Sequence, residues 1–107
     1  MTREQRMAEN EILFRQVNER ILEIEAHKWH VDPIDFMCEC ADETCTHPVR
    51  LSTEAYERLR SDPARFAVLP GHEVEDIERV VETHPTYLVV EKLPPAREVA
   101  VEADPRA

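Results

Sequence analysis

Three cysteines and a histidine lie within ten consecutive positions of this 107-residue chain. Their spacing is C-x-C, then four residues, then C-x-H, formed by Cys38, Cys40, Cys45 and His47. Thiolates this close together repel one another unless a cation neutralises them, and Zn²⁺ accepts thiolate ligands in a tetrahedral shell. An odd number of cysteines also cannot close into disulfides without a remainder. The stretch therefore predicts a structural zinc site with the three cysteines as ligands.

A closed tetrahedral site needs a fourth ligand, and two histidines compete for that position. His47 is the nearer in sequence, because it follows Cys45 by two residues. His72 comes directly after Pro70-Gly71, a tight turn that fixes the direction of the imidazole and lets the backbone approach closely. We favour His72 as the fourth ligand and keep His47 as the alternative.

Composition excludes several kinds of enzyme. Gly71 is the only glycine, so the chain has neither a phosphate-binding loop nor a dinucleotide fingerprint. Neither serine is flanked by glycine, so there is no nucleophile elbow, and the H-E-x-x-H and H-x-E motifs of zinc enzymes are absent. A zinc-dependent hydrolase with Glu39, Glu43 or Glu73 as general base is an alternative. Three thiolates make zinc a poor Lewis acid, so we expect no enzyme.

The chain carries a formal net charge of -10, which argues against nucleic acid as a partner. The acidity is concentrated in residues 31–92, which hold six basic and fourteen acidic residues, a net charge of -8. A small basic group formed by Arg58, Arg60 and Arg65 leaves a weak nucleic-acid-binding module as an alternative. The acidic surface otherwise suits a basic protein partner.

We expect a cytoplasmic protein. The apolar runs are too short to span a bilayer, and the first ten residues lack the basic and apolar regions of a signal peptide. In a reducing compartment clustered cysteines are more often metal ligands or redox thiols than disulfides. A thiol-based redox or metal-sensing switch is therefore another alternative.

Residues 1–30 predict a long amphipathic helix. Thr2 and Gln5 have the spacing of a capping box. Glu11 and Arg15 have the spacing of a favourable i,i+4 ion pair. No glycine or proline interrupts residues 3–28. Such a helix is ~39 Å long, more than a small domain needs. Either it packs along the domain, or it binds a homodimer mate or an unknown protein partner through one face. The residues predicted for that face are Phe14, Val17, Ile21 and Ile24.

The rest of the chain predicts an α+β fold. Residues 31–92 form a small zinc-stapled domain and residues 93–107 a disordered tail. The domain contains one short helix, which Ser52 or Thr53 caps and Asp62-Pro63 ends, and a hairpin that turns at residues 84–86. Residues 74–82 are ambiguous between helix and strand. The predicted strands cover residues 34–38, 49–51, 66–69 and 87–91.

The chain resembles a family of small uncharacterised actinobacterial proteins over roughly residues 10–92. The shared blocks are N-E-x-L-F-R-x-V-N-E-R-I at residues 10–21, F-x-C-E-C at 36–40 with a later cysteine at 45, L-[ST]-x-x-x-Y at 51–56, P-x-R-F at 63–66, P-G-H at 70–72 and Y-x-V-V-E-K at 87–92. The resemblance implies a cytosolic actinobacterial protein and favours His72 over His47, because P-G-H belongs to the pattern. The family brings no established activity.

Together these observations predict a non-catalytic zinc-binding domain that acts in protein–protein interaction, with a regulatory role. Zn²⁺ is the expected cofactor, and its role is to hold a small core together.

Overall fold

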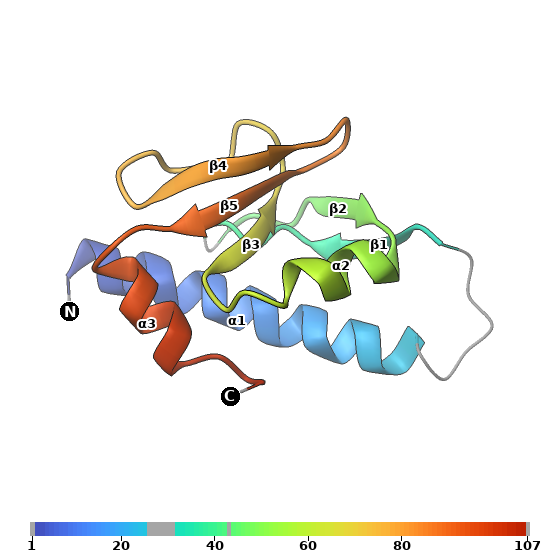
Figure 1. The fold of residues 1–107 in the computed structure, drawn as a ribbon, viewed down its shortest axis with the longest axis horizontal. Coiled ribbons are helices and arrows are strands. Elements are labelled where there is room, and N and C mark those ends of the chain that lie inside the picture. Colours follow the sequence, from blue (N-terminus) through green and yellow to red (C-terminus); the bar gives the residue numbers. More distant parts are fainter. Residues whose placement is uncertain (1, 26–31, 43, 107) are drawn as a thin grey trace.

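A helix of 23 residues, α1 (Arg3–Glu25), runs along the length of the molecule (Figure 1). The computed structural model describes residues 2–25, 32–42 and 44–106. The predicted capping box is confirmed, since the Thr2 backbone donates to Gln5 Oε1 at 2.9 Å and the Gln5 backbone to Thr2 Oγ1 at 3.1 Å. Residues 26–28 of the predicted helix lie outside the described residues. Within the described residues, no helix has the length and apolar character to cross a membrane.

The strands form two small antiparallel sheets. One pairs β1 (Ile34–Met37) with β2 (Pro48–Leu51), and the other has the order β3-β5-β4. In the second sheet β5 (Leu88–Lys92) lies between β3 (Arg65–Val68) and β4 (Glu78–Thr83). The predicted α+β class and the hairpin between β4 and β5 are confirmed. Residues 78–83 are strand, which settles the ambiguity over that segment.

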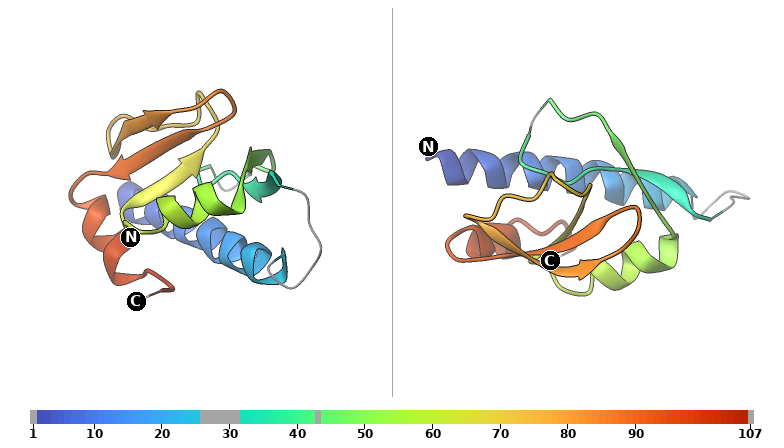
Figure 2. Two further views of the ribbon diagram at one scale, coloured as in Figure 1. Left: turned by 45° about the vertical axis from the view of Figure 1, so that its right-hand side comes forward. Right: turned by 90° about the horizontal axis from the view of Figure 1, so that it is seen from above.

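A short helix, α2 (Thr53–Leu59), joins the two sheets, and Ser52 is its cap, as its Oγ accepts from the Ala55 backbone at 3.0 Å. Figure 2 shows the sheets and α2 on one side of α1. The core lies between these elements, where the Phe36 and Tyr56 rings stack with centroids 4.5 Å apart. Other core residues with less than 4% of their surface exposed are Val49, Leu51, Phe66, Val68, Val89 and Val90.

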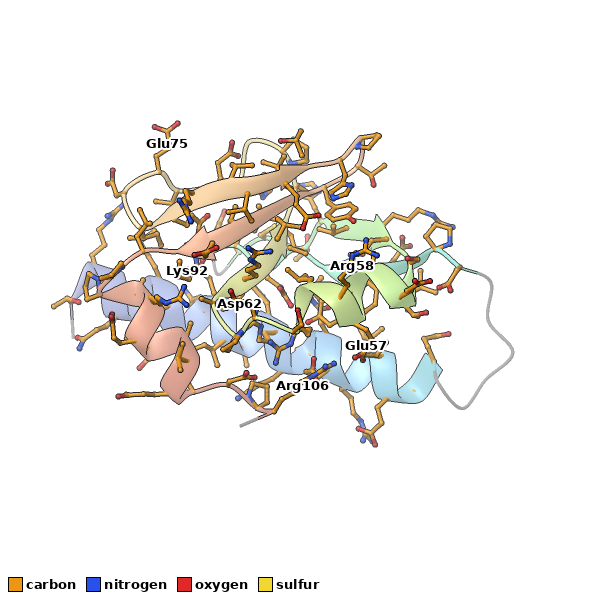
Figure 3. The ribbon with its side chains drawn as sticks, viewed as in Figure 1. Glu57, Arg58, Asp62, Glu75, Lys92 and Arg106 are labelled. Atoms are coloured by element: carbon orange, nitrogen blue, oxygen red, sulfur yellow. The ribbon has the colours of Figure 1, made fainter. Side chains whose placement is uncertain are left out.

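The prediction of a disordered tail at residues 93–107 is wrong. Residues 96–102 form α3 (Ala96–Glu102), which packs against α1 and β5 and buries Ala96 and Ala100, one helical turn apart. Beyond it Arg106 donates to both Glu57 carboxylate oxygens, at 3.0 and 2.9 Å (Figure 3). The small apolar side chains of this segment hide its periodicity, because alanine at a close helix contact adds little to a hydropathy pattern.

The side of α1 that faces the domain is polar at its centre. Glu11, Arg15 and Asn18 are fully buried, each 0% exposed, whereas Leu13 is 55% exposed. The predicted pair of Glu11 with Arg15 is not formed: Glu11 contacts Lys92, and Arg15 donates to the carbonyl oxygens of residues 63 and 65. Over its described residues the helix packs along the domain, against β1 and α3.

Lys92 anchors one end of this polar face. Its ammonium group contacts the carboxylates of Glu11 on α1 and Glu78 on β4. Burial disfavours the charged form of each group, so it raises the pKa of Glu78 to about 7 and lowers the pKa of Lys92 to about 7.

We predict that replacing Glu78 by Gln changes the pH dependence of stability. A raised pKa means that Glu78 stabilises the fold below its unfolded value, a contribution that is lost as pH rises through about 7. Relative to Glu78→Gln, the wild type should therefore lose about 1.3 kcal/mol of unfolding free energy between about pH 6 and about pH 8. Denaturant unfolding at both pH values measures this, with exposed Glu75→Gln as control. A constant difference between wild type and Glu78→Gln would contradict the prediction.

Candidate metal centre

Two connections between strands bring the predicted ligands together. Residues 38–47, between β1 and β2, carry Cys38, Cys40 and Cys45, and residues 69–77, between β3 and β4, carry His72. Backbone hydrogen bonds hold the first connection against its surroundings, from Cys38 to His47 at 3.4 Å and from Glu39 to Ala67 at 2.8 Å. The two connections belong to different sheets, but the bond from Glu39 to Ala67 of β3 brings them together, so a ligand 27 residues beyond Cys45 reaches the cysteines.

Asp42 shapes the cysteine connection locally. Its side chain accepts from the Thr44 backbone at 2.9 Å and from the Thr44 hydroxyl at 2.7 Å, and its carbonyl accepts from the Cys45 backbone at 3.0 Å. A short turn closed in this way, with its side chain bonded two residues on, is what aspartate favours. The turn folds Cys45 back toward Cys38 and Cys40.

The turn at Pro70-Gly71 directs the histidine. The His72 backbone donates to the Leu69 carbonyl at 3.0 Å, and Gly71 has a φ of 92°, the left-handed conformation that favours glycine. The Leu69 backbone donates to the sulfur of Cys38 at 3.3 Å, so the same turn also supports a thiolate. From this turn the imidazole of His72 lies close to the cysteines, as the sequence predicted.

The four donor atoms have the spacing of a metal shell. Nδ1 of His72 lies 3.6 Å from Sγ of Cys38 and 3.6 Å from Sγ of Cys45, and all four donors lie within 4.8 Å of one another. Zinc bonds of ~2.3 Å to sulfur and ~2.05 Å to nitrogen, at the tetrahedral angle, separate sulfur and nitrogen by about 3.6 Å. These two separations match that value, and the cluster could hold a metal ion.

The thiols are buried and electrostatically coupled. Cys38, Cys40 and Cys45 are 0%, 2% and 6% exposed. The hydrogen bond between Cys38 and Cys40 raises the pKa of the Cys38 thiol and lowers the pKa of the Cys40 thiol to about 5. Burial raises the pKa of Cys45. Cys40 thus forms a thiolate readily, whereas Cys38 and Cys45 favour the thiol form. A bound cation would favour loss of the proton from these two thiols.

His47 stands beside the cluster without joining it. Its ring is exposed and meets the His72 ring edge-on, with centroids 6.0 Å apart. The group of possible ligands contains His72 and not His47. The structure therefore brings together the favoured set of Cys38, Cys40, Cys45 and His72.

Glu39, between two of the cysteines, is tied to three different elements. Its carboxylate accepts from the Tyr56 hydroxyl of α2 at 2.6 Å, from Asn18 Nδ2 of α1 at 2.9 Å and from the Ala67 backbone of β3 at 2.9 Å. The side chain is 0% exposed. A buried carboxylate is costly unless donors of this kind satisfy it, so Glu39 fixes the cysteine connection relative to all three elements.

Asn18 completes the link between α1 and the cluster. Besides its bond to Glu39, its side chain accepts from the Met37 backbone N–H at 2.7 Å and donates to the Met37 carbonyl at 2.9 Å. Asn18 thereby fixes both the N–H and the carbonyl of Met37, the residue directly before Cys38. Further along α1, the Asn10 side chain donates to the Ala41 carbonyl at 3.2 Å.

Sequence reasoning missed Glu39 and Asn18 as supports of the cluster. Glu39 was considered only as a general base, together with Glu43, which lies outside the described residues, and Glu73, whose carboxylate accepts from the Gly71 backbone at 2.7 Å. The available signal was the position of a carboxylate between two cysteine ligands, where metal sites often have supporting hydrogen bonds.

The other candidate residues are placed as follows. Of the predicted partner-binding face, Val17 and Ile24 are 39% and 41% exposed, Ile21 is half-buried against the core, and Phe14 is buried. Phe14 therefore does not lie on an open face. In the basic group, Arg60 is buried and pairs with Glu19 and Asp104, while Arg65 lies near carboxylates of Asp62, Glu82 and Glu91.

Comparisons of the chain with protein-family models, with curated proteins and with solved structures find no match. The site is therefore interpreted from its own geometry.

We predict that Glu39→Gln destabilises the protein by about 2–4 kcal/mol, because the amide NH₂ must face one of the three donors that now share the carboxylate. Chemical denaturation of the metal-loaded protein measures the loss. Glu54→Gln, at an exposed position of α2, is the matched control and should change stability by less than about 0.5 kcal/mol. Equal stability of the two variants would show that Glu39 does not support the connection.

Proposed function

We propose that this chain is a non-catalytic zinc-binding domain that acts through protein–protein contacts. The observation that carries the zinc assignment is the 3.6 Å separation of His72 Nδ1 from two cysteine sulfurs, which is the ligand spacing of tetrahedral zinc. Three thiolates and one imidazole are also the donor set that zinc accepts, whereas magnesium and calcium prefer oxygen.

The surroundings of the cluster support a structural rather than a catalytic metal. A catalytic zinc usually keeps an open position for water, and four protein ligands fill the tetrahedral shell. Glu39, which lies between two of the cysteines in sequence, accepts three hydrogen bonds and is therefore not a free base. The burial of the three thiols also restricts oxidants, which supports a structural role over a redox switch.

Protein contact is the proposed mode of action because of how the surface charges and apolar residues are distributed. Arg60 and Arg65 are engaged with carboxylates, so they offer little to a phosphate backbone. The apolar side chains of Leu13, Val17 and Ile24, in contrast, are exposed on α1. We extend the proposal to a cytoplasmic, regulatory protein of the small actinobacterial family that the blocks in residues 10–92 resemble.

Metal analysis tests the zinc proposal. Protein purified without chelator should contain about one equivalent of zinc, and removing the metal should unfold or loosen the domain. His72→Ala should lose most of the metal, while His47→Ala, at a neighbouring imidazole outside the cluster, should keep it. Less than about half an equivalent in the wild type, or equal losses in the two variants, would contradict the proposal.

A further inference from the structure

The side of α1 that faces away from the domain carries a narrow apolar stripe. Leu13, Val17 and Ile24 are 55%, 39% and 41% exposed, although each is a large apolar side chain. Their spacing of four and then seven residues places them along one line of the helix, as in the seam of a two-helix coiled coil. We call these residues, with the exposed charged residues Arg6, Glu9, Arg20 and Glu23, the outer face.

The outer face is rigidly presented. The opposite side of α1 is held by the buried contacts of Glu11 with Lys92, of Arg15 with two carbonyls and of Asn18 with the cysteine connection. The helix therefore cannot rotate to bury Leu13 and Val17 without leaving these polar groups unsatisfied. A straight helix of 23 residues, ~34 Å long, remains available along its outer side.

We propose that the outer face binds the same face of a second copy of this chain, with the two helices antiparallel. This inference rests on the proposed zinc-held fold, because that fold keeps the polar side of α1 turned inward. A two-fold axis makes such an interface self-complementary, so each contact occurs twice.

Charge complementarity selects the antiparallel second copy. Within one chain Arg20 pairs with Glu23 at 3.2 Å, and both side chains stay largely exposed. With Leu13 opposite Val17 of the second copy, Arg20 also lies beside Glu9 of the second copy and Arg6 beside Glu23 of the second copy. The apolar centre is thus flanked on both sides by opposite charges. A parallel pair would instead place Arg6 against Arg6 and Arg20 against Arg20, and like charges across an interface are unfavourable.

The size of the outer face sets the expected affinity of the dimer. A stable interface buries ~800 Å² on each partner, and three partly exposed apolar side chains supply only a fraction of that area. The dimer should therefore be weak and concentration-dependent, with the ion pairs providing orientation more than affinity.

A charge-exchange cycle tests both the partner and the register. In the zinc-loaded full chain, Arg20→Glu faces Glu9 of the second copy, and Glu9→Arg faces Arg20, so each should raise the dissociation constant about tenfold. The double variant exchanges the two charges and should restore association. Sedimentation over a concentration series measures the dissociation constants of the wild type and the three variants. Glu98→Arg, at an exposed position of α3, is the charge-reversal control.

Leu13→Glu provides a second probe of the apolar centre and should abolish association. All substituted residues on α1 are exposed, so helix content and zinc content should stay at wild-type values. A zinc-loaded wild type that is monomeric at every concentration would overturn the dimer and leave the zinc proposal standing. Failure of the double variant to recover association would also overturn it. A wild type without zinc would instead overturn the proposed function.

Discussion

The buried carboxylate of Glu39 is the interaction on which the rest of the structure depends. A negative charge placed between two cysteine ligands and removed from water is tolerated only where donors satisfy its oxygens. Here the donors come from three elements, α1, α2 and β3. The connection that carries the cysteines is therefore positioned by the whole fold, and the geometry of the cluster follows from the packing of three elements around one side chain.

The same requirement explains why α1 turns a polar side inward. Glu11, Arg15 and Asn18 are buried because each has a partner that only the folded chain supplies: Lys92, backbone carbonyls and the Met37 peptide unit. Arg15 also lies over the Phe66 ring, 3.5 Å from its centroid. Such groups stabilise little in net terms, but a shifted or rotated helix would leave them unpaired, so they specify one position of α1. The apolar residues left outside are then available to a partner.

The metal cluster and this polar layer share one structural task. A chain of about a hundred residues buries a modest core, and a metal adds a cross-link between loops that apolar packing does not reach. The Asp42 turn and the Pro70-Gly71 turn shape the two connections before any ion is considered. A bound metal ion would join connections that are already close in space, which would limit the conformational entropy lost on binding.

The sequence by itself determined the local features, because their causes lie within a few residues. The Thr2–Gln5 capping box, the Ser52 cap, the strands around Phe66 and Val90, and the three cysteines as a group follow from propensity, short hydrogen bonds and ligand spacing. Only the tertiary structure decided which side of α1 is buried, since hydropathy assigns Glu11, Arg15 and Asn18 to solvent and cannot see distant partners. Tertiary structure likewise brought His72 rather than the nearer His47 to the cysteines, because two strand connections meet in space. It also decided that Ala96 and Ala100 are buried, because α1 and β5 cover this side of α3.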